Sequence, residues 1–140
     1  MRILCGTDIV EIKRVMRSTA LKEDGSFPSF VTKCYTEDEI SYCMKINNED
    51  KRAERFAARF AVKEAVSKAL GTGLMTMGIS LLDIETVIDE LGAPSVKLYG
   101  EAKKRADDLG IVSMSVSMSH DGDYAISYCT ALAADEEDKK

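Results

Sequence analysis

The sequence has few of the residues with which zinc and redox sites are usually built. It contains one histidine, His120, and four cysteines, and no two cysteines have the Cys-x-x-Cys spacing of a zinc or dithiol motif. A structural zinc site is therefore disfavoured. The first eight residues already include Asp8 and form no signal-peptide core, so the scattered thiols predict a cytoplasmic protein with reduced cysteines.

Long apolar runs and an excess of positive charge are also absent. No stretch approaches the roughly 18 apolar residues that cross a bilayer, so we expect no membrane segment. The 19 Lys and Arg residues against 24 Asp and Glu residues give a net charge of −5, which argues against a general nucleic-acid binder. Two prolines, no repeat and no low-complexity linker predict one domain over residues 1–132, followed by a charged, disordered tail over residues 133–140.

Apolar periodicity and turn residues predict an α+β fold. Strands are expected at about residues 2–11, 82–88 and 95–98 and on both arms of a hairpin that turns at Asp121-Gly122. Helices are expected at about 12–18, 36–46, 50–70 and 99–109, with a turn of helix over Phe30-Val31. Thr36 stands three residues before Glu39 and predicts a capping box at the start of the helix at 36–46. The first hairpin arm alternates serines with Val112, Met114, Val116 and Met118. One face of the second arm has only small residues, Ala125, Ser127, Cys129 and Ala131, which leaves room for close packing.

The long helix expected at about 50–70 concentrates positive charge. Residues 51–70 carry six basic and two acidic side chains, although the chain as a whole is acidic. At 100° per residue, a basic stripe forms from Arg52, Arg55, Arg59 and Lys63. An anionic ligand would bind at such a stripe, but an ordinary solvated helix face has the same composition.

Two carboxylates are predicted to face inward from separate elements. Glu64 falls within the apolar stripe of the long helix, and Asp8 shares a strand face with Leu4 and Val10. Together they could hold Mg²⁺, which takes few protein oxygens and keeps positions for phosphate and water. The simpler interpretations are an i,i+4 pair of Glu64 with Lys68 and a turn aspartate beside Gly6.

Gly71 and His120 each have a structural interpretation beside a functional one. Gly71 opens the segment Gly71-Thr72-Gly73, whose amides could approach a phosphate, although a helix C-cap is the simpler role. His120 stands at the mouth of the final hairpin, where a single histidine is more often structural than catalytic.

Several segments match the motifs of one enzyme family. The two more specific matches are Gly6-Thr7-Asp8-Ile9-Val10-Glu11-Ile12 and Arg59-Phe60-Ala61-Val62-Lys63-Glu64-Ala65-Val66-Ser67-Lys68-Ala69. Weaker matches are Thr36 with Glu39, Gly71-Thr72-Gly73, Gly92-Ala93-Pro94, and Val116-Ser117-Met118-Ser119-His120 through Tyr124-Ala125. In these motifs, over roughly residues 3–132, the chain resembles the holo-[acyl-carrier-protein] synthases, the small 4′-phosphopantetheinyl transferases.

The resemblance implies a reaction, a metal and an assembly. The phosphopantetheine arm of coenzyme A would pass to a serine of an apo acyl carrier protein in fatty-acid biosynthesis, leaving adenosine 3′,5′-bisphosphate. Asp8 and Glu64 would hold Mg²⁺ against the pyrophosphate. The implied fold is the family's small antiparallel sheet packed on a long central helix, assembled as a trimer with active sites between subunits.

The resemblance also implies roles for single residues. Glu64, Lys68 and His120 would be catalytic, with the serine proton taken either by Glu64 or by a metal-bound water acting with it. Coenzyme A would be bound by Arg59, Lys63, Lys68, Gly71, Pro94 and His120. Arg14 matches the family's carrier-binding arginine, and Arg17 follows it in the same basic segment, which suits an acidic carrier protein.

Two other functions fit parts of the sequence. A non-catalytic domain that binds coenzyme A or another nucleotide would use the basic helix, but would not need both Asp8 and Glu64. A structural interaction module would need neither, and the basic stripe would then be only a solvated face.

Overall fold

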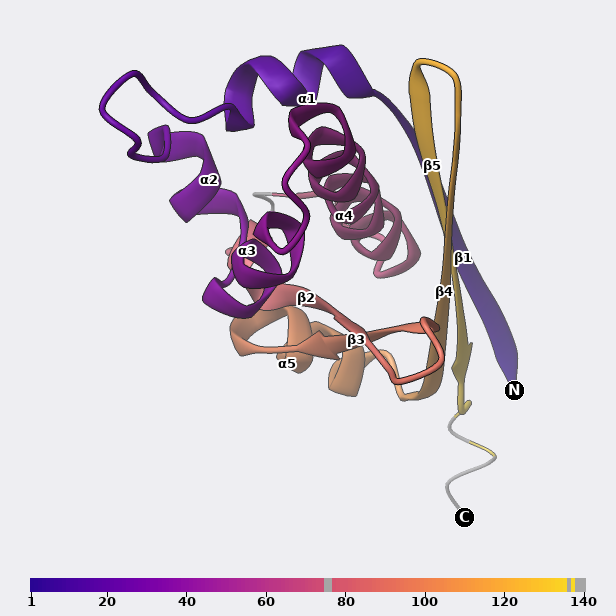
Figure 1. Cartoon of the computed structure of the whole chain (residues 1–140). Helices are drawn as coiled ribbons and strands as arrows, with labels where there is room; N and C mark the ends of the chain where they lie inside the picture. The colour runs from indigo at the N-terminus through magenta and orange to yellow at the C-terminus, as the bar shows by residue number, and fades with distance from the viewer. Residues whose placement is uncertain (75–76, 136, 138–140) are drawn as a thin grey trace.

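The computed structural model describes residues 1–74, 77–135 and 137, and places a long helix against one face of an antiparallel sheet (Figure 1). In chain order the elements are β1 (Arg2–Glu11), α1 (Ile12–Thr19), α2 (Ser29–Cys34), α3 (Glu37–Met44), α4 (Glu49–Ala69), the short 3₁₀ helix η1 (Leu81–Asp83), β2 (Ile84–Ile88), β3 (Pro94–Leu98), α5 (Gly100–Asp108), β4 (Ile111–Asp121) and β5 (Tyr124–Ala133). The main sheet has the order β1–β5–β4, and β2 pairs with β3 in a separate two-stranded sheet. The α+β prediction is confirmed.

Residues with little side-chain volume allow α4 to lie close to the sheet. On β5 the inner face is buried and consists of Ala125, Ser127, Cys129, Ala131 and Ala133. On β1, Gly6 contacts the helix so closely that a β-carbon there would lie 2.0 Å from the carbonyl oxygen of Ala65. The small face predicted from sequence is therefore the contact surface of α4, and Gly6 brings the Asp8 segment onto the helix.

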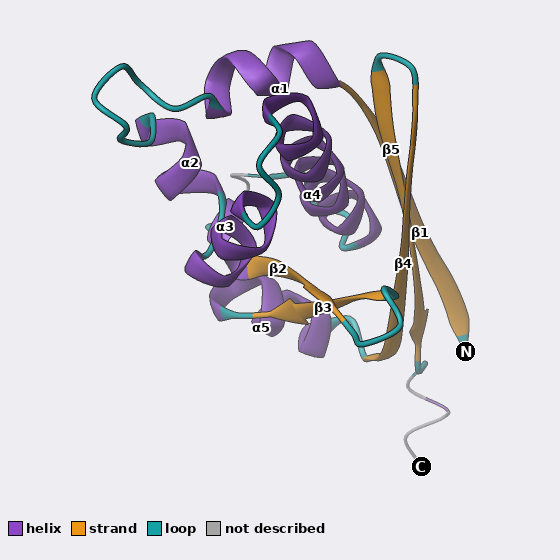
Figure 2. Cartoon of the chain, viewed as in Figure 1, coloured by secondary structure: helices purple, strands orange, loops and turns teal. Residues whose placement is uncertain are grey.

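The other face of the main sheet is uncovered. Figure 2 shows the helices gathered on one side of the three strands, with none of the described elements on the other side. Large apolar side chains on this outer face are between 45% and 72% exposed: Ile3, Ile9, Tyr124, Ile126 and Tyr128. A monomeric protein rarely exposes such a contiguous apolar surface, so this face has the properties of an interface.

Three local features differ from the sequence prediction. Residues 81–83 form η1 rather than the start of a strand, because Ser80 and Asp83 cap one another in a capping box. Met114, Val116 and Met118 of β4 are half-buried, whereas Val112 is exposed. The difference arises because the strand has an irregularity between Ile111 and Ser113. The predicted turn of helix around residue 30 is the six-residue α2.

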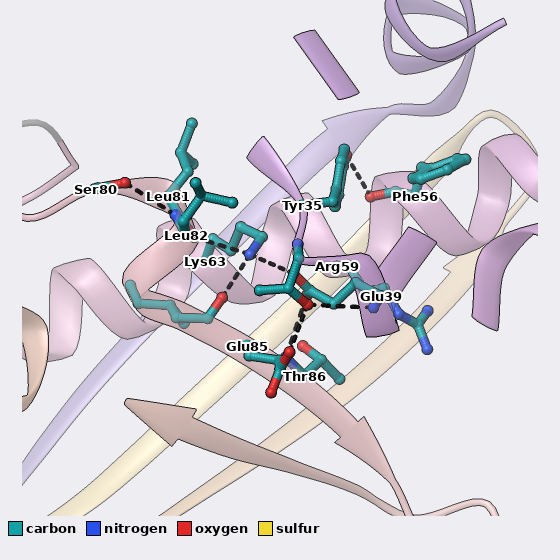
Figure 3. A network of polar contacts seen from close by, with 12 residues as sticks. Tyr35, Glu39, Phe56, Arg59, Lys63, Ser80, Leu81, Leu82, Glu85 and Thr86 are labelled. Carbon is teal, nitrogen blue, oxygen red and sulfur yellow. Dashed lines mark hydrogen bonds and ion pairs between the residues drawn. The ribbon is translucent and has the colours of Figure 1, made fainter. Parts of the chain in front are cut away.

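A buried ion pair joins α3, α4 and β2 (Figure 3). The Lys63 ammonium lies 2.8 Å from Glu39 Oε1, and both side chains are fully buried. Lys63 Nζ also donates to the carbonyl oxygens of Leu81 and Ile84. Glu39 in turn accepts from the backbone N–H groups of Thr36 and Thr86, at 3.0 and 3.2 Å. The predicted Thr36–Glu39 capping box is confirmed, and it belongs to this larger network.

The two ends of the chain meet at Asp135. Its carboxylate pairs with the amino group of Met1 at 2.7 Å and with Arg2 at 3.2 Å. Of the segment predicted as a tail, Ala133 closes β5, and residues 136 and 138–140 lie outside the described residues. Within the part of the chain that the structure describes, no helix is both long and apolar enough to cross a membrane.

Candidate active site

Asp8 and Glu64 line one cavity of about 500 Å³ between β1, α1, α2 and α4. β1 supplies Asp8 and α4 supplies Glu64, and the tight contact at Gly6 holds these two elements together. The apolar wall includes Phe30 and Phe60. The structure thus brings together the two inward carboxylates predicted from sequence.

Glu64 is a half-buried carboxylate that makes no hydrogen bond or ion pair with any residue the structure describes. Burial, and then the neighbouring Asp8 carboxylate, raise the pKa of Glu64, while Lys68 opposes this shift. A carboxylate that is partly desolvated and faces a second one is stabilised by a cation. Among the described residues, no group of three or more His, Cys, Asp or Glu side chains could hold a metal ion.

Lys68 is bound to Asp8. Its ammonium lies 3.2 Å from Asp8 Oδ1 and donates to the carbonyl oxygen of Thr7 at 2.9 Å. The simple i,i+4 ion pair of Glu64 with Lys68 is therefore not what the structure contains. Lys68 does not itself line the cavity, but its side chain is about half exposed (52%), so its ammonium remains accessible to an anion beside Asp8.

Arg14 lines the same cavity from α1, together with Ser18 and Val15. Its neighbour Arg17 is exposed on the same helix but does not line the cavity. The structure therefore brings Arg14 to the carboxylate pair and leaves Arg17 on the adjoining surface.

A second cavity, of about 340 Å³, is lined by two of the remaining predicted residues, Arg59 and His120. Arg59 lines it from α4, and His120 lines it from the end of β4. His120 Nε2 lies 3.8 Å from Glu54 Oε2, and Gly92 also lines this cavity. Arg55 of the predicted basic stripe also lines this cavity, together with Tyr42 and Lys51, which were not predicted from sequence.

The two cavities lie on different sides of α4. Arg59 and Glu64 are five residues apart, which places their side chains roughly 140° apart around the helix axis. Asp8 and His120 lie on the two outer strands of the main sheet, separated by β5. At about 4.8 Å per strand, the backbones of β1 and β4 are roughly 10 Å apart. One chain therefore presents two separate cavities rather than one continuous cavity. We call them the carboxylate cavity and the arginine cavity.

The structure contradicts the prediction that Lys63 binds phosphate. Its side chain is fully buried and its ammonium is occupied by Glu39 and two carbonyl oxygens, so no ligand can reach it. The interpretation of the basic stripe as a solvated face is wrong for Lys63 and also for Arg59, which is only 2% exposed. Burial lowers the pKa of Lys63, and the Glu39 carboxylate acts in the opposite direction.

Gly71 and Pro94 lie outside the lining of both cavities. Gly71 has φ +76° just after the end of α4, which is the helix C-cap geometry that glycine favours. Pro94 begins β3 and pairs with Ile88, which does line the arginine cavity. Pro94 is thus a neighbour of that cavity, and Gly71 follows Lys68 by one helical turn.

Comparison with known proteins assigns this arrangement to a class. Residues 4–129 match the 4′-phosphopantetheinyl transferase superfamily. The holo-[acyl-carrier-protein] synthase of Ruminiclostridium cellulolyticum is 41% identical over 137 residues, covering 96% of each chain. The same enzyme of Thermoanaerobacter sp. strain X514 is 38% identical over 138 residues, covering 99% of this chain and 93% of the relative.

Solved structures agree with the sequence relatives. The holo-[acyl-carrier-protein] synthase of Helicobacter pylori, crystallised with coenzyme A, is similar with a TM-score of 0.74 and 31% identity, over 92% of this chain and all of that one. The fold and both motifs therefore define a phosphopantetheine–protein transferase. Within that class, the chain belongs to the holo-[acyl-carrier-protein] synthase family.

Proposed function

We propose that the carboxylate cavity of one chain and the arginine cavity of another together form the active site for phosphopantetheine transfer from coenzyme A to a serine of an apo acyl carrier protein. The observation that carries this proposal is the half-buried Glu64 carboxylate, which has no hydrogen-bond or ion-pair partner among the described residues and lies beside Asp8. The test is to incubate the protein with apo carrier, coenzyme A and Mg²⁺ and to measure the carrier mass. We expect a gain of one phosphopantetheine. An unchanged carrier mass would exclude the transferase and favour one of the two alternatives, a non-catalytic nucleotide-binding domain or a structural interaction module.

The carboxylate cavity suits Mg²⁺. Two carboxylates from different elements are the oxygen ligands that this ion takes, and the remaining positions suit phosphate and water. Asp8 and Glu64 would hold it, and when bound it would neutralise charge on the pyrophosphate as the phosphoanhydride bond of coenzyme A breaks and the serine phosphodiester forms. Lys68, already beside Asp8, is placed to bind a phosphate oxygen. The proton that the carrier serine loses would pass either to Glu64 or to a metal-bound water acting with it.

The outer face of the main sheet supplies the subunit contact. Its exposed apolar residues would be buried when three copies assemble, and assembly would bring different sides of neighbouring α4 helices together. The two cavities of one chain lie on different sides of α4, which makes it difficult for them to act on one substrate together. A site shared between subunits would not require them to do so. It also explains why the large apolar residues of β5 face away from its own core.

The cellular setting follows from the substrates. An acyl carrier protein acceptor places the reaction in fatty-acid biosynthesis. The four cysteines are free thiols, three of them buried, which suits the reducing cytoplasm.

Removing the Glu64 charge should stabilise the protein when no metal is bound. Because the pKa of Glu64 is raised in the folded state, its ionised form destabilises the fold. This penalty is absent below its ordinary pKa of 4.5 and grows as the pH rises toward the raised value. In chelator, Glu64→Gln should therefore melt at a higher temperature than wild type at pH 7, with the difference lost below pH about 4.5. A lower melting temperature at pH 7 would show that the carboxylate has a stabilising partner.

Reversing the charge of Arg14 should weaken carrier binding selectively. Arg14 lines the carboxylate cavity from α1, where an acidic carrier must approach to present its serine. We expect Arg14→Glu to raise the KM for carrier about tenfold or more, with the KM for coenzyme A nearly unchanged, and the defect to shrink as salt increases.

Lys104→Glu is the matched control, because it makes the same charge change at an exposed position on α5. It should leave carrier kinetics unchanged. If the double variant Arg14→Glu, Arg17→Glu keeps wild-type carrier kinetics, the docking surface lies elsewhere.

A further inference from the structure

Tyr42 lies at the centre of the cationic groups of the arginine cavity. Its ring centroid is 4.3 Å from the guanidinium carbon of Arg59 and 4.6 Å from that of Arg55. The ammonium of Lys45 is 5.8 Å from the same centroid. Three cations thus surround one aromatic ring, and two of them line the cavity beside it.

The backbone around Tyr42 fixes the same arrangement. Its carbonyl oxygen accepts a hydrogen bond from Arg55 Nη1 at 2.9 Å, and Arg59 Nη1 donates to the carbonyl oxygen of Arg55 at 3.1 Å. Tyr42 follows Glu39 by three residues on α3, so the buried Lys63–Glu39 pair holds this helix against α4. The ring therefore occupies a defined position relative to both guanidinium groups.

Neither Arg55 nor Arg59 makes an ion pair with a carboxylate of the described residues. Arg59 is 2% exposed, and its Nε is buried without a hydrogen-bond partner. Two like charges side by side repel one another, and an aromatic face offsets this repulsion only partly. A phosphate group, which accepts parallel hydrogen bonds from guanidinium groups, would complete the arrangement.

We propose that Tyr42 is a positioning residue that holds Arg55 and Arg59 as a paired receptor for one phosphate group of the coenzyme A nucleotide. This inference rests on the proposed function, since that function puts a phosphorylated nucleotide in the arginine cavity. Tyr42 does not take part in the chemistry. It fixes two flexible side chains before the ligand arrives, which lowers the conformational entropy lost on binding.

Calorimetric binding of adenosine 3′,5′-bisphosphate to the metal-free protein tests the proposal. Tyr42→Leu removes the ring and should weaken binding about five- to thirtyfold, in the range expected for contacts between a ring and two cations. Tyr42→Phe keeps the ring and should bind within about twofold of wild type. In steady-state kinetics, Tyr42→Leu should raise the KM for coenzyme A and leave kcat and the KM for carrier unchanged.

A purely structural role for Tyr42 predicts other results. If it only packs α3 against α4, Tyr42→Leu should weaken nucleotide binding equally in wild type and in an Arg55→Gln, Arg59→Gln background. Our proposal requires its effect to disappear in that background. If Tyr42→Leu does not fold, Tyr42→Met serves in its place. Equal losses for Tyr42→Phe and Tyr42→Leu would overturn the proposal, whereas a wild-type protein that fails to bind the bisphosphate would overturn the proposed function itself.

Discussion

Mixed assemblies of Glu64→Gln and Arg59→Gln chains are expected to recover about a quarter of wild-type transfer, although each variant alone is nearly inactive. Each site would take its carboxylate cavity from one subunit and its arginine cavity from a neighbour. In a random one-to-one mixture each half is intact with a probability of about one half, so about one site in four has both. The measurement is kcat/KM for coenzyme A of the co-expressed chains, taken before assemblies of different composition are separated.

The control is a mixture of two variants that are both altered in the carboxylate cavity. Glu64→Gln mixed with Asp8→Ala alters the same cavity in both chains, so no complete site can form and no activity should return. Analytical ultracentrifugation should show a trimer for every mixture. Activity that never exceeds the sum of the separate variants would mean that both cavities serve one chain on its own.

Replacing Lys63 is expected to cost about 3–5 kcal/mol of unfolding free energy, the usual effect of removing one partner of a buried ion pair. Lys63→Met would leave the Glu39 carboxylate fully buried, with its charge uncompensated. Since a domain of this size is stable by only about 5–15 kcal/mol, the variant should be close to unfolding at 37 °C. Urea denaturation followed by circular dichroism measures the change.

Two variants make the Lys63 result specific. Lys103→Met removes a lysine from an exposed i,i+4 pair with Asp107 and should change stability by less than about 0.5 kcal/mol. Lys63→Met combined with Glu39→Gln leaves no buried charge and should recover part of the loss. A single Lys63→Met variant as stable as Lys103→Met would show that water reaches the pair.

Local patterns account for most of what the sequence predicted about the fold. The capping box at Thr36, the C-cap at Gly71 and the small face of β5 depend on residues close in sequence, and each lies where it was expected. The inward positions of Asp8 and Glu64 followed from strand and helix periodicity. Such features are set by the backbone geometry of single elements.

The features that the sequence did not predict depend on tertiary packing, that is, on which helices and strands contact one another. Periodicity puts Lys63 in one stripe with Arg59, but only the packing of α3 and β2 shows that Lys63 is buried against Glu39. Tyr42 was missed because its partners lie on another helix. The separation of the two cavities, by contrast, could have been derived from the five residues between Arg59 and Glu64.

The contact between Gly6 and Ala65 limits how this sequence can vary. A β-carbon at Gly6 would lie 2.0 Å from a backbone oxygen of α4, so any larger residue there must push β1 away from the helix. Asp8, two residues further on, would move with the strand while every group that touches substrate stayed chemically intact. A substitution that adds only a methyl group could then abolish activity without altering one functional side chain. In mutational surveys, such positions would be indistinguishable from catalytic ones.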